Sequence, residues 1–69
     1  MRHRRDVVTE LFGYRIERVR AFGEHGDVTA QWYEVLAPGT GAGLGGYAHR
    51  AEAERAIVAR ELTATRTAA

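Results

Sequence analysis

Residues 27–36 read DVTAQWYEVL and predict a β-strand, because Val, Thr, Trp and Tyr dominate the segment and favour extended backbone. Successive side chains of a strand point to opposite faces of a sheet. One face would carry Val28, Ala30, Trp32 and Leu36, and the other Thr29, Gln31, Tyr33 and Val35. We expect Trp32 to anchor the core, which leaves Tyr33 and Gln31 on the open side of the sheet.

The chain after this strand predicts a hairpin and a helix. Pro38 ends the strand, and residues 39–46 form a glycine-rich loop. Residues 44–48, LGGYA, are a short third strand at most, whereas residues 50–62, RAEAERAIVAREL, are strong helix formers. The side chains that can face a sheet are Ile57, Val58 and Leu62, with Glu54 and Glu61 at the edge of the packed face. Residues 63–69 are expected to be a frayed tail.

The chain before residue 27 is open to two interpretations. Residues 1–9 have no apolar residue between Met1 and Val7 and predict a flexible basic arm. Residues 14–22 alternate as a strand with one phase slip, which a β-bulge near Glu17 or Arg18 would reconcile. The same region fits a helix capped by Asp6 and ended by Gly23, with an apolar stripe of Val8, Phe12, Ile16 and Val19. We favour the strand, followed by a turn in GEHGD, residues 23–27.

These elements predict the fold class. Three strands and one C-terminal helix make a single small α+β domain over residues 10–62, with a three-stranded antiparallel sheet packed against the helix on one face. A chain of 69 residues buries only a small core, so self-association as a homodimer is a live alternative to packing alone.

The residue types that the chain lacks exclude several reaction classes. The chain contains no Lys, Ser, Asn or Cys, so serine and cysteine nucleophiles, lysine Schiff bases and disulfides are impossible. The histidines, His3, His25 and His49, are scattered and have no thiolate partners for a zinc site. We therefore expect a protein that is not an enzyme and uses no metal or cofactor.

The hydropathy of the chain indicates the cellular compartment in which we expect the protein. No apolar run approaches the roughly 20 residues that a membrane-spanning helix needs. The arginines near the start are not followed by the apolar segment of a signal peptide. We expect a cytoplasmic protein that does not contact a membrane.

The glycine-rich loop contains Gly41, Gly43 and Gly46 in the spacing G-x-G-x-x-G. A dinucleotide-binding fingerprint requires a helix directly after the last glycine and then a second parallel strand. Residues 47–49 separate Gly46 from the predicted helix, and nothing after the helix is strand-like. The spacing therefore indicates a hairpin loop.

The net charge of +1 is unevenly distributed. Residues 1–9 carry three arginines and one aspartate, residues 10–26 are balanced, and residues 27–62 have two more acidic than basic residues. Any basic surface must therefore come from the N-terminal third of the chain. All ten basic residues are arginines, whose planar guanidinium suits phosphate recognition.

Three segments resemble a known family: QWYEVLAPGTG, then GGY, then RAEAERA. Over residues 27–62 the chain resembles the small arm-type DNA-binding domain at the N-terminus of tyrosine recombinases of the phage-integrase kind. The matching positions are Trp32, Gly39, Gly46, Tyr47, Glu52 and Ala53. The resemblance implies a three-stranded sheet that enters the DNA major groove, with Thr29, Gln31, Tyr33 and either Arg15 or Arg18 directed toward bases or phosphates.

Two functions fit these observations. The first is a non-enzymatic module that binds nucleic acid, most readily DNA, through the open sheet face and the basic arm. Its contacts would be Arg2, Arg4, Arg5, Arg15, Arg18 and Arg20 on phosphates, and Gln31 and Tyr33 on bases. The alternative is a protein-interaction module, a small regulator or inhibitor that binds a partner protein or a second copy of itself, which the near-zero net charge favours.

Overall fold

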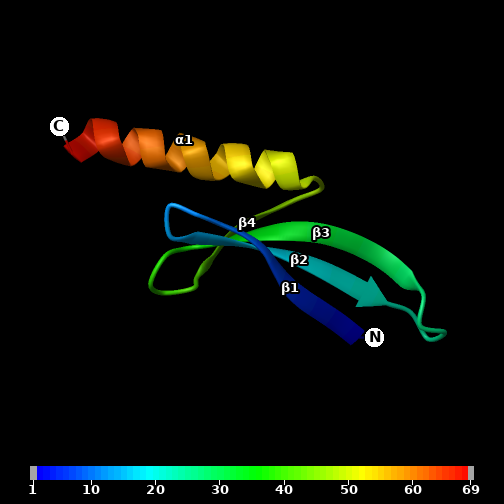
Figure 1. Cartoon of the computed structure of the whole chain (residues 1–69). Coiled ribbons are helices and arrows are strands. Elements are labelled where there is room, and N and C mark those ends of the chain that lie inside the picture. Colours follow the sequence, from blue (N-terminus) through cyan, green and yellow to red (C-terminus); the bar gives the residue numbers. More distant parts are fainter. Residues whose placement is uncertain (1, 69) are drawn as a thin grey trace.

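The computed structural model describes residues 2–68, and their side chains through residue 64. Four strands, β1 (Arg2–Leu11), β2 (Tyr14–Phe22), β3 (Val28–Leu36) and β4 (Gly43–Tyr47), are followed by one helix, α1 (Arg50–Ala68). The strands form one antiparallel sheet in the order β1-β2-β3-β4. The helix packs on one face of this sheet and leaves the other face bare (Figure 1). The predicted α+β class, with an antiparallel sheet and one C-terminal helix, is confirmed.

The sheet has four strands rather than the three predicted. The additional strand, β1, consists mostly of residues assigned to the basic arm, and it pairs with β2 along its length. The helical alternative for residues 6–22 is wrong, because these residues form the β1–β2 hairpin. The helix continues to Ala68, through residues expected to fray. Met1 and Ala69, the outermost residues of the expected arm and tail, lie outside the described residues.

A two-residue turn, Phe12-Gly13, joins β1 to β2. Both residues have positive φ angles, 53° for Phe12 and 82° for Gly13, as hairpin turns of type I′ require. Glycine adopts this conformation freely, but a bulky side chain rarely does. Phe12 is nevertheless 59% exposed, so burial does not compensate for its strained backbone.

The phase slip in β2 arises because both faces of this strand are buried. Ile16 lies on the helix side and Val19, three residues on, lies on the opposite side; both have no exposed surface. The bulge predicted in β2 lies instead in the facing strand, where the register shifts between Val7 and Thr9. This shift is opposite Glu17 and Ile16, close to the predicted position but on the other strand.

The core is small and lies at one end of the sheet. Ile16 and Val35 from the sheet pack with Ala53 and Ile57 from α1, and all four are almost completely buried. Partly buried side chains surround them: Val8, Leu11, Tyr14, Tyr33, Leu44 and Tyr47. The helix residues that face the sheet are therefore Ala53 and Ile57, whereas Val58 and Leu62, which were also expected to face it, are 41% and 59% exposed.

The two faces of β3 are the reverse of the prediction. Tyr33 and Val35 face the helix, and Trp32 lies on the bare side. Glu34 explains this reversal, because it lies on the same face of β3 as Trp32 and Leu36. If that face packed against the helix, the Glu34 carboxylate would enter the core. Trp32 instead covers Val19, its cross-strand partner, and donates its indole N–H to Glu34 Oε2 at 2.9 Å.

The glycine-rich segment closes the β3–β4 hairpin. The amide of Ala37 donates to the carbonyl oxygen of Ala42 at 2.8 Å, and Gly39 and Gly41 have positive φ angles in the turn. Gly43 and Gly46 belong to β4, which pairs with β3 in antiparallel fashion. The spacing G-x-G-x-x-G is thus a hairpin, as predicted.

Helix α1 begins with a reciprocal cap. The Glu52 carboxylate accepts a hydrogen bond from the His49 amide at 3.1 Å, while the His49 carbonyl oxygen accepts from the Glu52 amide. Within residues 2–68, no helix is long and apolar enough to cross a membrane.

The molecule is elongated, with extents of 53 × 21 × 15 Å. Its radius of gyration is 13.9 Å, whereas a compact chain of this length would have about 11 Å. The elongation follows from the offset of the two layers, because β1, β2 and the start of β3 extend past the first turn of α1, and the C-terminal part of α1 extends past the other end of the sheet (Figure 1).

Candidate functional site

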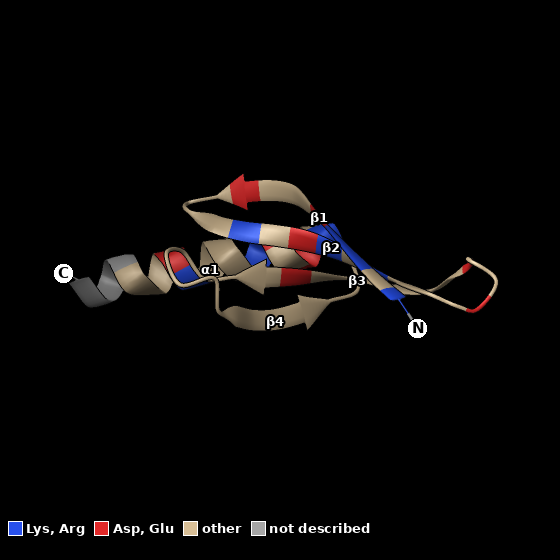
Figure 2. Ribbon diagram, turned by 90° about the horizontal axis from the view of Figure 1, so that it is seen from below, with Lys and Arg blue, Asp and Glu red and all other residues tan. Residues whose placement is uncertain are grey.

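The part of the sheet that extends past α1 carries a cluster of arginines. They lie on the same face that packs against α1 at the other end of the sheet. Arg2 and Arg4 of β1 share this face with Arg18 and Arg20 of β2, since Arg4 is paired with Arg20 and Asp6 with Arg18. We call these four residues the arginine face. In Figure 2 the part of β1 beside the N-terminus is largely blue, and blue segments of β2 lie nearby.

One carboxylate, Asp6, sits among these guanidinium groups. Its nearest partner is the Arg20 guanidinium at 3.0 Å, with Arg4 at 3.6 Å and Arg18 at 3.9 Å. The hydrogen bond from Arg20 and the charges of Arg4, Arg20 and Arg18 lower the pKa of Asp6. Asp6 is therefore ionised at neutral pH, yet it neutralises only one of four positive charges.

The guanidinium groups keep donors available. The Arg4 side chain is 67% exposed, and those of Arg18 and Arg20 are 35% and 26% exposed. Among the described residues, the buried Nε atoms of Arg18 and Arg20 have no hydrogen-bond partner. These two Nε atoms are shielded from solvent, so an anionic ligand would be bound by the exposed parts of the positively charged guanidinium groups.

Further side chains complete this surface. Gln31 is exposed and pairs with Arg20 across the β2–β3 ladder, and Tyr33 pairs with Arg18 at the border of the helix. Phe22 follows Arg20 on the same face, and the Arg20 guanidinium carbon lies 5.9 Å from the centre of the Phe22 ring. A polar amide and an aromatic ring therefore adjoin the arginines.

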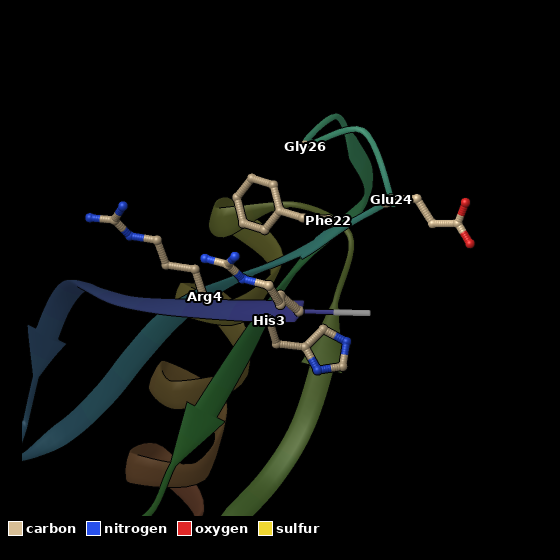
Figure 3. A pocket seen from close by; sticks show the side chains of 7 residues that line it. His3, Arg4, Phe22, Glu24 and Gly26 are labelled. Carbon is tan, nitrogen blue, oxygen red and sulfur yellow. The ribbon is translucent and has the colours of Figure 1, made fainter.

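A pocket of about 780 Å³ opens at the far end of this surface. It is lined by Arg2, His3, Arg4, Phe22, Gly23, Glu24 and Gly26. Arg4 and Phe22 lie on one side of β1 and His3 on the other, while the Glu24 carboxylate points away from them (Figure 3). The pocket therefore joins an aromatic ring to two guanidinium groups.

The bare face holds Arg5 and Arg15, the two remaining predicted contacts with nucleic acid, and Arg5 lies there beside two carboxylates. Arg5 donates to Glu34 Oε1 at 2.6 Å and to Glu17 Oε1 at 3.2 Å. The hydrogen bonds from Arg5 and Trp32 lower the pKa of Glu34, and the two carboxylates raise the pKa of Arg5. The Arg5 charge is thus fully neutralised within the protein.

The structure therefore divides the eight predicted contacts between the two faces. Arg2, Arg4, Arg18, Arg20, Gln31 and Tyr33 lie together on the helix side, whereas Arg5 and Arg15 lie on the bare side. The expected position of Tyr33 on the bare side is wrong, because it packs against the core. Phe22 was not among the eight predicted contacts, although the alternation Arg18, Arg20, Phe22 along one strand is a signal that could have identified it.

Two of the three scattered histidines lie in exposed connections between elements. His25 and His49 are both exposed, the first in the β2–β3 turn and the second at the start of α1. Within the described part of the chain, no three His, Asp or Glu side chains group closely enough to hold a metal ion.

Comparison of the chain with protein-family models, curated proteins and solved structures found no match. The resemblance to recombinase arm-type domains stays a prediction. The function is therefore argued from the geometry of the arginine face.

Proposed function

We propose that the protein is a non-enzymatic module that binds nucleic acid, in the first instance DNA, through the arginine face. The observation that carries the proposal is a cluster of four arginines with one carboxylate, which pairs with three of them, on a part of the sheet that the helix does not cover. Arginine side chains bind phosphates with bidentate geometry, and phosphate contacts supply most nonspecific affinity. Gln31 lies beside Arg20 across the β2–β3 ladder, where it can contact a base.

The near-zero net charge does not oppose this function, because the charges are segregated. Excess negative charge belongs to residues 27–62, whereas every member of the arginine face comes from the first 20 residues. Arg5 is held by Glu17 and Glu34 on the opposite face and is not a contact in this proposal.

The test is the anisotropy of labelled DNA, both duplex and single-stranded, at about 50 mM and about 200 mM salt. Four phosphate contacts give a slope of log affinity against log salt of about −3.6 for duplex and about −2.8 for single strands. Replacing Arg4 and Arg18 by Gln should reduce the magnitude of this slope by about half and weaken binding to both forms.

A matched variant controls for charge. Arg15 and Arg55 are exposed and lie outside the arginine face, so replacing both by Gln removes the same charge. This control should bind nearly as well as the wild type. Equal losses in the two double variants would show that the surface is wrong, and absence of binding to either form of DNA at low salt would overturn the proposal.

Protein interaction is the second candidate function. The large radius of gyration and the exposure of Phe12, Val58 and Leu62 at the opposite end of the molecule favour it. Sedimentation velocity over a range of concentrations tests the simplest case, a homodimer. A mass that rises with concentration, and that Leu62→Glu returns to the monomer, would support this function.

A further inference from the structure

We infer that the pocket beside Phe22 receives an unpaired nucleobase, so that the protein prefers single-stranded to duplex nucleic acid. This inference rests on the proposed function and names the form of nucleic acid that the same surface binds. It starts from the pocket, whose volume of about 780 Å³ lies within the range of small-ligand sites and accommodates a nucleotide.

The pocket combines the two groups that single-strand binding needs. Aromatic rings stack on bases of any sequence, and neighbouring cations hold the phosphates. Phe22 provides the ring, and Arg2 and Arg4 line the same pocket. Arg20, which contacts the Phe22 ring, does not line the pocket, so part of the ring remains available to a ligand.

The walls of the pocket leave room for a base. The β2–β3 turn contributes Gly23 and Gly26, which have no side chains to fill the space, and a Cβ atom at Gly26 would contact nothing within 4 Å. Glu24 points its carboxylate away from Arg4 and Phe22 (Figure 3). The recess is thus open toward solvent and is not blocked by an acidic group.

The phosphates of the bound nucleic-acid strand can continue from the pocket onto the sheet. Arg4 borders both the pocket and Asp6, and from there Arg20 and Arg18 follow along β2. A nucleic acid with one base in the pocket would place its sugar-phosphate backbone along these arginines. A duplex offers phosphates to the same arginines but no unpaired base to the pocket, and flipping a base out of a stack costs energy.

The test uses Phe22→Leu, which keeps an apolar side chain but removes the aromatic ring, and Phe22→Trp, which keeps a ring. The ligands are an oligothymidylate of about 12 nucleotides, within the usual site sizes, and a duplex. The wild type should bind the oligothymidylate more tightly than the duplex. Phe22→Leu should weaken single-strand binding about tenfold and leave duplex binding unchanged, while Phe22→Trp should retain both.

Tryptophan emission gives a second readout that does not depend on affinity. Trp32 lies on the opposite face of the sheet but contacts His3, which lines the pocket, so the wild-type emission serves as the reference for any indirect change. In Phe22→Trp the oligothymidylate should quench the added indole by stacking.

The outcomes distinguish failure of the inferred single-strand preference from failure of the proposed nucleic-acid binding. Salt-dependent binding with no preference for single strands, or with no effect of Phe22→Leu, would overturn the inference and leave the arginine face as a general DNA-binding surface. Absence of quenching of the added indole in Phe22→Trp, despite binding of the oligothymidylate, would also overturn it. Absence of binding to both ligands would overturn the proposed function itself.

Discussion

Asp6 is the residue that most directly controls the arginine face. Its carboxylate accepts a hydrogen bond from Arg20 and attracts Arg4 and Arg18, and it thereby occupies donors that would otherwise face a ligand. In the free protein it holds like charges together. A bound phosphate would compete with Asp6 for the same guanidinium groups.

Replacing Asp6 by Asn should therefore raise DNA affinity. The change removes the negative charge that attracts Arg4, Arg18 and Arg20 and weakens the hold on the Arg20 guanidinium. We expect binding to tighten severalfold at about 50 mM salt and the gain to shrink at about 200 mM, because salt screens exposed charges. Anisotropy measures the effect, and Glu10→Gln, at an exposed position near the other end of β1, is the control for the same change of charge. Weaker binding by Asp6→Asn would mean that Asp6 organises the arginines more than it competes for them.

At the scale of the elements, one cluster of polar side chains ties β1, β2 and β3 together on the bare face. Arg5 of β1 bridges Glu17 of β2 and Glu34 of β3, and Trp32 adds a hydrogen bond to Glu34. The His3 ring lies edge-on to Trp32, with 5.9 Å between the ring centres. These contacts cover Val19, which is fully buried although no helix packs above it.

This cluster predicts a pH dependence of stability. The pKa of Glu34 is lowered in the folded protein, so ionised Glu34 stabilises the fold above its ordinary value of 4.5. That contribution is lost as the pH falls below this value and through the lowered pKa. The wild type should unfold at a higher temperature than Glu34→Gln at pH 7, and the difference should shrink progressively as the pH falls below 4.5.

Circular dichroism over a pH series measures this difference. Glu24→Gln, which changes an exposed carboxylate in the β2–β3 turn, should show no comparable dependence. A constant difference between wild type and Glu34→Gln at every pH would show that Glu34 acts through packing rather than through its charge.

The sequence predicted the secondary-structure elements better than it predicted the face of the sheet on which each side chain lies. β2, β3, the β3–β4 hairpin and the start of α1 were recognisable from alternation, glycines and helix formers. β1 was missed because Arg2, Arg4 and Arg5 resemble an arm when no partner strand is considered. The arginine face could not be derived from composition, because it depends on the register that sets Arg4 beside Arg20 and Asp6 beside Arg18.

The faces of β3 were inverted for a reason that the sequence does contain. Trp32 was placed in the core by size, although Glu34 shares its face by alternation. A carboxylate in a small apolar core costs more than an indole left partly exposed. Weighing Glu34 against Trp32 would have turned Tyr33 and Val35 inward, as the structure has them.

At the scale of the whole molecule, one small core supports an elongated sheet. Ile16, Val35, Ala53 and Ile57 are the buried residues that join the helix to the sheet, and they occupy only one end of it. A chain of this size derives no more than about 5 kcal/mol from such a core. The fold therefore has little stability to lose.

Replacing Ile57 by Ala should unfold much of the protein at ordinary temperatures. Truncating a buried isoleucine costs about 2–5 kcal/mol, which is comparable with the whole stability of the domain. Thermal unfolding followed by circular dichroism measures the loss. Val58→Ala, at an exposed neighbouring position, should change the stability by about 0.5 kcal/mol or less. Equal losses in both variants would indicate that Val58 is covered by a partner in solution.

The partial cover that α1 gives the sheet also has a consequence for local opening. Amide protons of Ile16 and Val35, beneath the helix, should exchange with solvent only when the whole domain opens, whereas those of β1 and β2 around Arg4 and Arg20 should exchange through smaller fluctuations. The segment proposed to bind a ligand is thus expected to be less protected than the core. A ligand that orders this segment would slow its exchange without changing that of the core, so occupancy could be followed strand by strand.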